Sequence, residues 1–278
     1  MKGTFTTTYR KRMPITLGKI FSPLDIAGCV CWLDAADAGS VTTSGSNITS
    51  WTDKSGTGNS MSASSNWPTY NTSGASQLNG QNTISFVATT GSSGQTLLGT
   101  WAGAAMTSGV TVFAVSKPDV PPVTSNNGMI VRLADASGNE AATLMVAGAT
   151  SSLAAKGTLF LDSNPSGVDL ETYPTTNLNA NTWRINMGQV SVSAPTATGT
   201  LYSNNVLIAG PSSATGSYST CVGSTLYAVC SDTVGTNFIS SVIAEIIYYS
   251  SAINSTDYTS VANYLSSKWN LALGTPVY

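Results

Sequence analysis

Short stretches of alternating hydrophobic and polar residues fill most of this chain, and turn residues separate them. The clearest interior strand is predicted at residues 110–118, where a proline ends it. An Asn79-Gly80 turn leads into another strand that ends at Phe86. Further strands are predicted at Cys29–Asp34 and at residues 129–133, 141–146, 159–161, 183–190, 200–202 and 206–209. Many short strands at such spacing predict a β-sandwich or a β-barrel.

The pattern changes near the C-terminus, where a strand is followed by the one persuasive helix. Residues 242–249 alternate with period two, which places Glu245 on the same face as Ile243 and Ile247. We expect Glu245 to be half-buried and to make a structural hydrogen bond. Helix N-cap oxygens are offered by Asn254, Ser255 and Thr256, and one apolar stripe follows at Tyr258, Val261, Ala262, Leu265 and Trp269. Gly274 and Pro276 are expected to end the helix.

No linker marks a domain boundary. Residues 118–127 and 193–199 are loop-like, but strands resume after each of them. We therefore predict an all-β fold, a two-sheet antiparallel jelly-roll sandwich at residues 23–278, with one short C-terminal helix. Residues 1–22 form a separate, extended N-terminal arm.

Charge is scarce and unevenly placed. Only 9% of residues are charged, whereas 41% are hydrophobic, which favours a folded protein over a disordered one. The arm carries five basic residues and no acidic one, and the net charge of the rest is −7. The basic residues of the arm are Lys2, Arg10, Lys11, Arg12 and Lys19.

A basic arm on an acidic body can bind an acidic protein partner, a nucleic acid or a membrane surface, or it can be a solvated tail. Nucleic acid is disfavoured because no basic body stands behind the arm. No segment has the pattern of a signal peptide, and no apolar run is long enough to cross a membrane. We expect the arm to lie against a neighbouring protein subunit.

The order of the motifs resembles the concanavalin A-like lectin/glucanase superfamily in its LamG-like jelly-roll form. The matching segments are W-L-D-A-A-D at 32–37, W-T-D-K-S-G-T-G-N at 51–59, the turn and strand at 79–86, V-F-A-V at 112–115, L-Y-S-N-N-V at 201–206, V-G-S at 222–224, the strand at 243–248 and the helix at 264–269. Asn205 stands where the family usually has a glycine. The resemblance implies two packed antiparallel sheets and a fold used for adhesion, glycan binding, structural roles or, in some branches, glycan hydrolysis.

The four cysteines do not decide whether the protein belongs to a reducing or an oxidising compartment. Cys29 and Cys31 are predicted on one face of a strand, in a buried apolar row. Cys221 and Cys230 either bridge a hairpin or remain free buried thiols, and the second reading is favoured.

Catalytic signatures are missing from the sequence. Serine–histidine–aspartate catalysis is excluded because the chain has no histidine. Hydrolytic branches of the resembled superfamily usually carry E-x-D-x-E on one strand, and Glu140, Glu171 and Glu245 show no such pairing. We therefore predict that the protein is not an enzyme, and glycoside hydrolysis is the least favoured function.

Two kinds of binding site remain open. Asp34, Asp37 and Asp53 either converge on a calcium ion or, as favoured here, bond to nearby amides in turns. Sugar binding needs an exposed aromatic ring beside polar groups, and four residues in polar segments are candidates: Trp67, Tyr70, Asn71 and Trp101. The other tryptophans, Trp32, Trp51, Trp183 and Trp269, follow core patterns.

Our leading prediction is a non-enzymatic structural protein of a virus particle, a capsid decoration, minor capsid or tail-fibre component. The arm would anchor it to capsid or tail subunits, and a homo-oligomer and a glycan are the further partners considered. It would be located in the virion, after assembly in the host cytoplasm. The alternative is a carbohydrate-binding adhesin module that recognises host or cell-surface glycans.

Overall fold

The structure is a computed structural model. It describes residues 19–63, 65–90, 93–102, 108–119, 127–134, 140–147, 159–163, 170–173, 181–215, 226–232 and 237–275. The basic residues Lys2, Arg10, Lys11 and Arg12, as well as Cys221, lie outside the described residues.

The described residues form antiparallel strands, two short 3₁₀ helices and one α-helix. The first half of the chain holds η1 (Pro23–Asp25), β1 (Cys29–Asp34), η2 (Ala38–Ser40), β2 (Val41–Ser44), β3 (Asn47–Trp51), β4 (Met61–Ser62), β5 (Thr69–Asn71), β6 (Thr83–Phe86), β7 (Ala88–Thr90), β8 (Ser93–Gly94), β9 (Leu97–Thr100), β10 (Gly109–Pro118) and β11 (Asn127–Ala134). The second half holds β12 (Glu140–Ala147), β13 (Leu159–Ser163), β14 (Leu170–Thr172), β15 (Arg184–Ser193), β16 (Thr196–Ser203), β17 (Val206–Thr215), β18 (Leu226–Val229), β19 (Ser241–Tyr249) and α1 (Ser255–Trp269).

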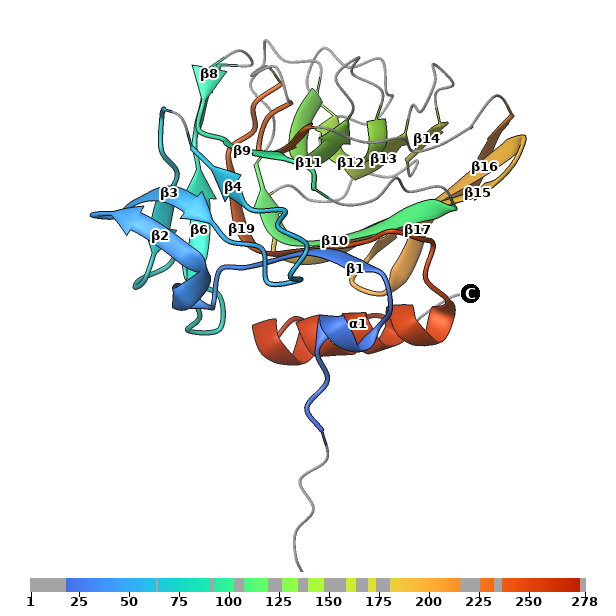
Figure 1. Cartoon of the computed structure of the whole chain (residues 1–278), viewed down its shortest axis with the longest axis horizontal. Coiled ribbons are helices and arrows are strands. Elements are labelled where there is room, and N and C mark those ends of the chain that lie inside the picture. The colour runs from blue at the N-terminus through green and yellow to red at the C-terminus, as the bar shows by residue number, and fades with distance from the viewer. Residues whose placement is uncertain are drawn as a thin grey trace, which may run out of the picture.

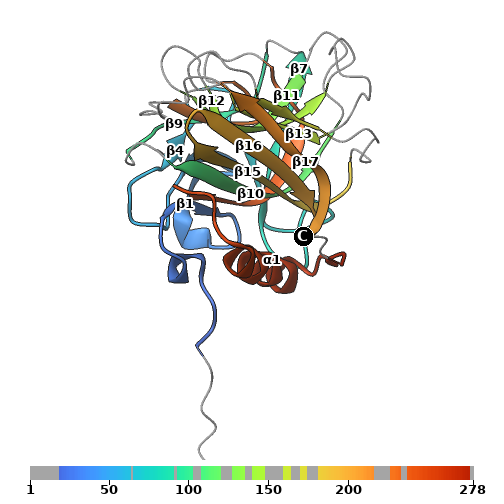
Figure 2. The same cartoon turned by 90° about the vertical axis from the view of Figure 1, so that its right-hand side faces the viewer.

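Two layers of sheet pack face to face, and α1 covers the outer face of one of them (Figure 1). The layer next to α1 is built on β19, which pairs with β10 on one side and with β1 and β6 on the other. From β10 this layer continues through β15, β16 and β17, which are best seen in Figure 2. The other layer runs from β2 through β3, β4, β9, β18, β11, β12 and β13 to β14. The two layers join where Asn47 pairs with Thr69, so the predicted all-β sandwich with a C-terminal helix is confirmed.

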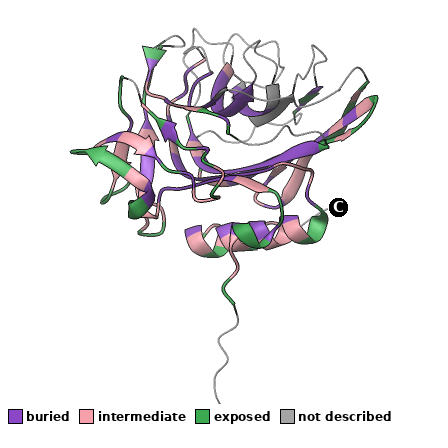
Figure 3. Cartoon of the chain, in the orientation of Figure 1, coloured by how far each residue is buried: buried purple, intermediate pink, exposed green. Residues whose placement is uncertain are grey.

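The hydrophobic core has two parts because strands of the α1-side layer bury both faces (Figure 3). One part lies between the sheets and includes Trp51, Leu144 and Tyr248. The other part lies between the sheet and α1 and includes Trp32 and Trp269. Strands buried on both faces read as nearly continuous apolar runs, as the sequence of β19 does.

A β-bulge in β19 decides where Glu245 points. Val115 of β10 faces Glu245 but Ser116 faces Ile243, so Ala244 is an extra residue on its strand. Ile243 therefore packs between the sheets, while Ala244 packs toward α1. The predicted unbroken alternation, with Ile243 and Glu245 on one face, was wrong because a bulge re-aims the side chains that follow it.

Helix α1 begins as predicted and ends earlier. The Asn254 side chain accepts hydrogen bonds from the backbone N–H groups of Thr256 and Asp257. At the C-terminus, Asn270 adopts a left-handed conformation (φ 53°) and caps the helix, in place of the expected Gly274 and Pro276. No helix among the described residues is long and apolar enough to cross a membrane.

Two further local predictions are corrected. Residues 193–199 were expected to be a loop, but β15 and β16 continue through them as a hairpin in which Ser193 pairs with Thr196. Cys29 and Cys31 lie on opposite faces, because the pairing with β19 shifts between them. Cys31 is in the core between the sheets, and Cys29 packs toward α1. Cys29, Cys31 and Cys230 are free thiols.

Candidate functional site

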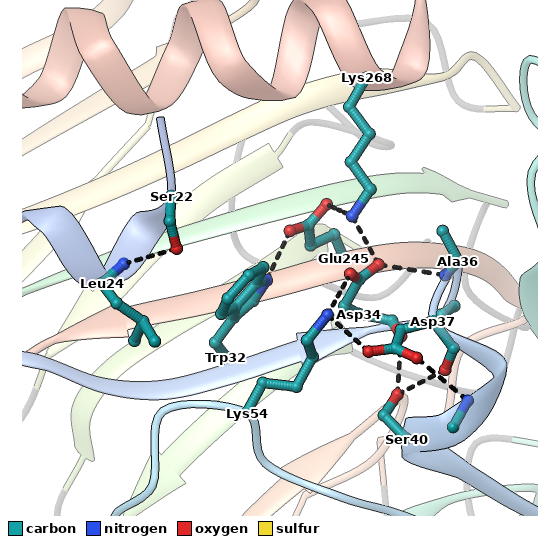
Figure 4. A network of polar contacts seen from close by, with 12 residues as sticks. Ser22, Leu24, Trp32, Asp34, Ala36, Asp37, Ser40, Lys54, Glu245 and Lys268 are labelled. Carbon is teal, nitrogen blue, oxygen red and sulfur yellow. Dashed lines mark hydrogen bonds and ion pairs between the residues drawn. The ribbon is translucent and has the colours of Figure 1, made fainter. Parts of the chain in front are cut away.

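A buried carboxylate, Glu245, is the centre of a polar cluster between β19 and α1 (Figure 4). Its residue is 1% exposed, so the expected half-burial was an underestimate. Two indole N–H groups donate to it, from Trp32 at 2.6 Å and from Trp269 at 2.7 Å. The Tyr264 hydroxyl donates to the same carboxylate at 2.9 Å. Nearly all of the acceptor capacity of Glu245 is therefore filled from inside the protein.

Two lysines join Glu245 to two aspartates. The Lys268 ammonium lies 2.8 Å from Glu245 Oε2 and 2.6 Å from Asp34 Oδ1. The Lys54 ammonium lies 2.9 Å from Asp34 Oδ2 and 2.7 Å from Asp37 Oδ2. We call these five residues, Asp34, Asp37, Lys54, Glu245 and Lys268, the ionic cluster.

The ionic cluster brings together distant parts of the sequence. Asp34 ends β1 and Asp37 follows it, Lys54 belongs to the loop after β3, Glu245 lies on β19 and Lys268 on α1. These positions fall within the W-L-D-A-A-D, W-T-D-K-S-G-T-G-N and closing strand–helix motifs. The motifs therefore meet in space because they build one buried contact between sheet and helix.

Burial raises the pKa of Glu245 above its ordinary value of 4.5, although the Lys268 ammonium opposes the shift. Burial also raises the pKa of the Tyr264 hydroxyl, and the charge of Glu245 raises it further. The outermost carboxylate behaves in the opposite way, since the hydrogen bond from Lys54 lowers the pKa of Asp37.

The raised pKa of Glu245 predicts a pH-dependent difference between the protein and its Glu245→Gln variant. The folded state holds this proton at pH values where the unfolded chain has released it, so its contribution to stability is lost as pH rises from 4.5 through the folded pKa. The free energy of unfolding of the variant minus that of the wild type should therefore increase between pH 4.5 and pH 8. We expect an increase of about 1.4 kcal/mol for each unit by which folding raises the pKa of Glu245. Urea unfolding of both proteins measures this, and parallel pH profiles would contradict it.

Asp34 and Glu245 are close enough for the carboxylate spacing of glycoside hydrolysis, since both contact one ammonium. Their side chains, however, are only 6% and 0% exposed. A glycosidase must bring both groups to the scissile bond, and here lysine and indole groups occupy their oxygens. The arrangement therefore stabilises the fold and offers no acid–base pair to a substrate.

A cavity of about 590 Å³ opens on the outer side of the ionic cluster, between the segment before η1 and α1. We call it the helix cavity, and it is lined by Ile20, Phe21, Ser260, Asn263, Tyr264, Ser267 and Lys268. The rings of Phe21 and Tyr264 lie 5.9 Å apart and form its aromatic wall. Cavities that combine apolar walls with a few convergent polar groups and perturbed titratable residues are typical ligand sites.

Two further cavities among the described residues are smaller. One of about 390 Å³ is lined by Gly58, Ser60, Ser62, Leu98, Gly99 and Thr100. Another of about 250 Å³ lies around Lys117, Asp119 and the start of β19. Neither places two aromatic rings beside free polar side chains among its described lining residues.

The sugar-binding candidates do not form one site. Trp67 is exposed (44%), but the Tyr70 hydroxyl donates to the Ala35 carbonyl and the Asn71 amide donates to Thr83 and Ser85. Trp101 is 7% exposed and packs edge-on against Tyr227 and Tyr248. The predicted exposure of Trp101 is therefore corrected, because its ring belongs to the core between the sheets.

The calcium candidates face hydrogen-bond donors. Asp53 accepts from the backbone N–H groups of Trp32, Ser55 and Asn59, so it organises its own loop. Asp34 and Asp37 face the two lysines of the ionic cluster. Among the described residues, no group of three or more such side chains could hold a metal ion.

Lys19 is the one basic residue of the arm that the structure describes. Its ammonium forms an ion pair with Asp25 of η1. Two residues later, Phe21 contacts α1, so the end of the arm lies against the sandwich.

Comparisons with known proteins find solved structures of similar fold, but no related sequence family. No protein-family model and no curated protein matches the sequence. The binding domain of Paraclostridial Mosquitocidal Protein 1 superposes with a TM-score of 0.55 at 12% identity, over 88% of this chain and 53% of that one. The binding domain of botulinum neurotoxin serotype D/C superposes with a TM-score of 0.56 at 11% identity, over 88% and 53%. A structure of botulinum neurotoxin type C, whose cell entry depends on two ganglioside molecules, superposes with a TM-score of 0.53 at 11% identity, over 86% of this chain and 51% of that one.

This chain therefore spans about half the length of those binding domains. At such identities the likeness establishes a shared β-sandwich architecture and nothing about the ligand.

Sequence reasoning missed the helix cavity. Its aromatic wall pairs Phe21, which was assigned to the arm, with Tyr264, which was assigned to a helix motif. The spacing of Asn263 and Ser267, one helical turn apart on the polar side of α1, was the available signal.

Proposed function

We propose that this protein is a non-catalytic recognition module that binds glycans in the helix cavity. One observation carries the proposal: an aromatic wall, a free amide and a free hydroxyl meet in a single cavity. Sugars present apolar C–H faces and many hydroxyl groups, which aromatic rings and small polar side chains complement. The similar solved structures are binding domains by name, which supports recognition over catalysis.

Asn263 and Ser267 supply the polar half of the site. Both side chains are exposed and lie one turn apart on α1, and neither makes a hydrogen bond to another described residue. An amide and a hydroxyl can each donate and accept, as sugar hydroxyls do. The apolar face of the sugar would lie on the wall that Phe21 and Tyr264 form together.

A glycan array probed with the full chain and its Phe21→Ala variant tests this proposal. We expect the wild-type protein to bind a defined set of glycans, and the variant to bind them at least ten-fold more weakly, which corresponds to about 1.4 kcal/mol. Trp67→Ala is the matched control, because it removes an exposed ring outside the cavity and should leave binding unchanged. Loss of binding in the control with retention in Phe21→Ala would overturn the assignment of the site.

A second function is compatible with the first and rests on the charge of the arm. We propose that the module is carried on a virus particle, as a capsid decoration, minor capsid or tail-fibre component, with residues 1–22 as its anchor on an acidic subunit. The five basic residues that precede the first acidic one support this proposal. Deletion of residues 1–18 should abolish incorporation into the particle and leave glycan binding intact. Unchanged incorporation would reject the anchor.

We also propose that the chain belongs to the concanavalin A-like superfamily in its LamG-like form. The support is the meeting of its quoted motifs in the ionic cluster, together with the two-layer sandwich. Residues 1–22 as arm and 23–278 as one sandwich remain the proposed division of the chain.

A further inference from the structure

The charge around the helix cavity bears on which glycans it accepts. Lys268 is the only charged side chain among the described residues that line it. An ammonium has three N–H donors, and Lys268 directs them to Asp34, Glu245 and the Tyr264 hydroxyl, the last at 3.1 Å. The one cation of the cavity therefore has no donor left for an anionic ligand.

The groups behind Lys268 add no positive charge. The ionic cluster contains three carboxylates and two ammonium groups, so its net charge is −1 when all are ionised and zero when Glu245 holds a proton. Lys19, which precedes the lining residues Ile20 and Phe21 in the chain, is paired with Asp25. Ser267 and Lys268 also lie in the last turn of α1, where the helix dipole is negative.

We infer that the helix cavity selects uncharged sugars and rejects sialylated or uronic-acid glycans, an inference that rests on the proposed glycan binding. A ligand carboxylate would approach the ionic cluster behind Lys268, and no described residue that lines the cavity offers it a free cation. Like charges placed together in a partly desolvated site cost several kcal/mol. Neutral sugar hydroxyls find Asn263 and Ser267, which carry no charge.

Matched glycan pairs test the selection directly. Isothermal titration of the full chain at pH 7 and low salt would compare lactose with 3′-sialyllactose, and N-acetyllactosamine with its sialylated form. We expect the neutral member of each pair to bind at least ten-fold more tightly. Equal or tighter binding of the sialylated members would overturn the selection and leave glycan recognition standing. Absence of binding to every glycan would instead overturn the proposed function, and the selection with it.

A charge-adding variant separates electrostatics from shape. Ser267→Lys places an unpaired ammonium on the cavity wall, and Ser267→Gln is its uncharged control of similar length. We expect Ser267→Lys to reduce the neutral-to-sialylated affinity ratio at least five-fold relative to Ser267→Gln. Equal ratios in the two variants would show that charge does not set the selection.

Discussion

Replacing Lys268 with methionine is expected to lower the free energy of unfolding by about 3–5 kcal/mol. Methionine keeps most of the length of the lysine's aliphatic stem, so the loss isolates the ammonium. Without it, Glu245 keeps the hydrogen bonds from the two indoles and Tyr264 but has no counter-charge, at a residue that is 1% exposed. Asp34 retains Lys54, and for that reason the main cost falls on Glu245.

Chemical denaturation of the single and double variants checks this result. Glu245→Gln removes the charge that Lys268→Met leaves unpaired, so the double variant should recover a large part of the lost stability. A cost below about 1 kcal/mol for Lys268→Met would mean that the cluster behaves as an exposed surface pair.

Replacing Trp269 with alanine is expected to cost a similar amount, about 3–5 kcal/mol, chiefly through the cavity it leaves. The Trp269 side chain is fully buried between α1 and the sheet, and its indole N–H donates to Glu245. Trp269→Phe separates the two contributions, because it fills most of the space and loses only the hydrogen bond. We expect about 1–3 kcal/mol for that variant.

Thermal and urea unfolding of the two Trp269 variants provide the measurement. Equal destabilisation by alanine and phenylalanine would contradict the packing account, since it would assign the whole effect to the hydrogen bond. If neither variant were destabilised, α1 would not unfold cooperatively with the β-sandwich.

Much of the fold follows from the sequence because it depends on local patterns. Strand β10 was predictable from its apolar run and terminal proline, and the N-terminus of α1 from the Asn254 cap. The core roles of Trp32, Trp51 and Trp269 were predictable in the same way, and the structure confirms them.

What could not be predicted depends on pairing between distant segments. The bulge at Ala244 is set by the register between β19 and β10, and it puts Ile243 and Glu245 on opposite faces of the sheet. The burial of Trp101 depends on Tyr227 and Tyr248, which lie far along the chain. The helix cavity likewise exists only because Phe21 packs on Tyr264 across most of the sequence.

The most direct test of the central claim, glycan recognition in the helix cavity, is a crystal structure of the full chain with a neutral glycan that it binds in solution. We predict a sugar ring lying on the aromatic wall that Phe21 and Tyr264 form together, with its hydroxyls on Asn263 and Ser267. A sugar bound at Trp67 or elsewhere, with the helix cavity open to solvent, would contradict the account.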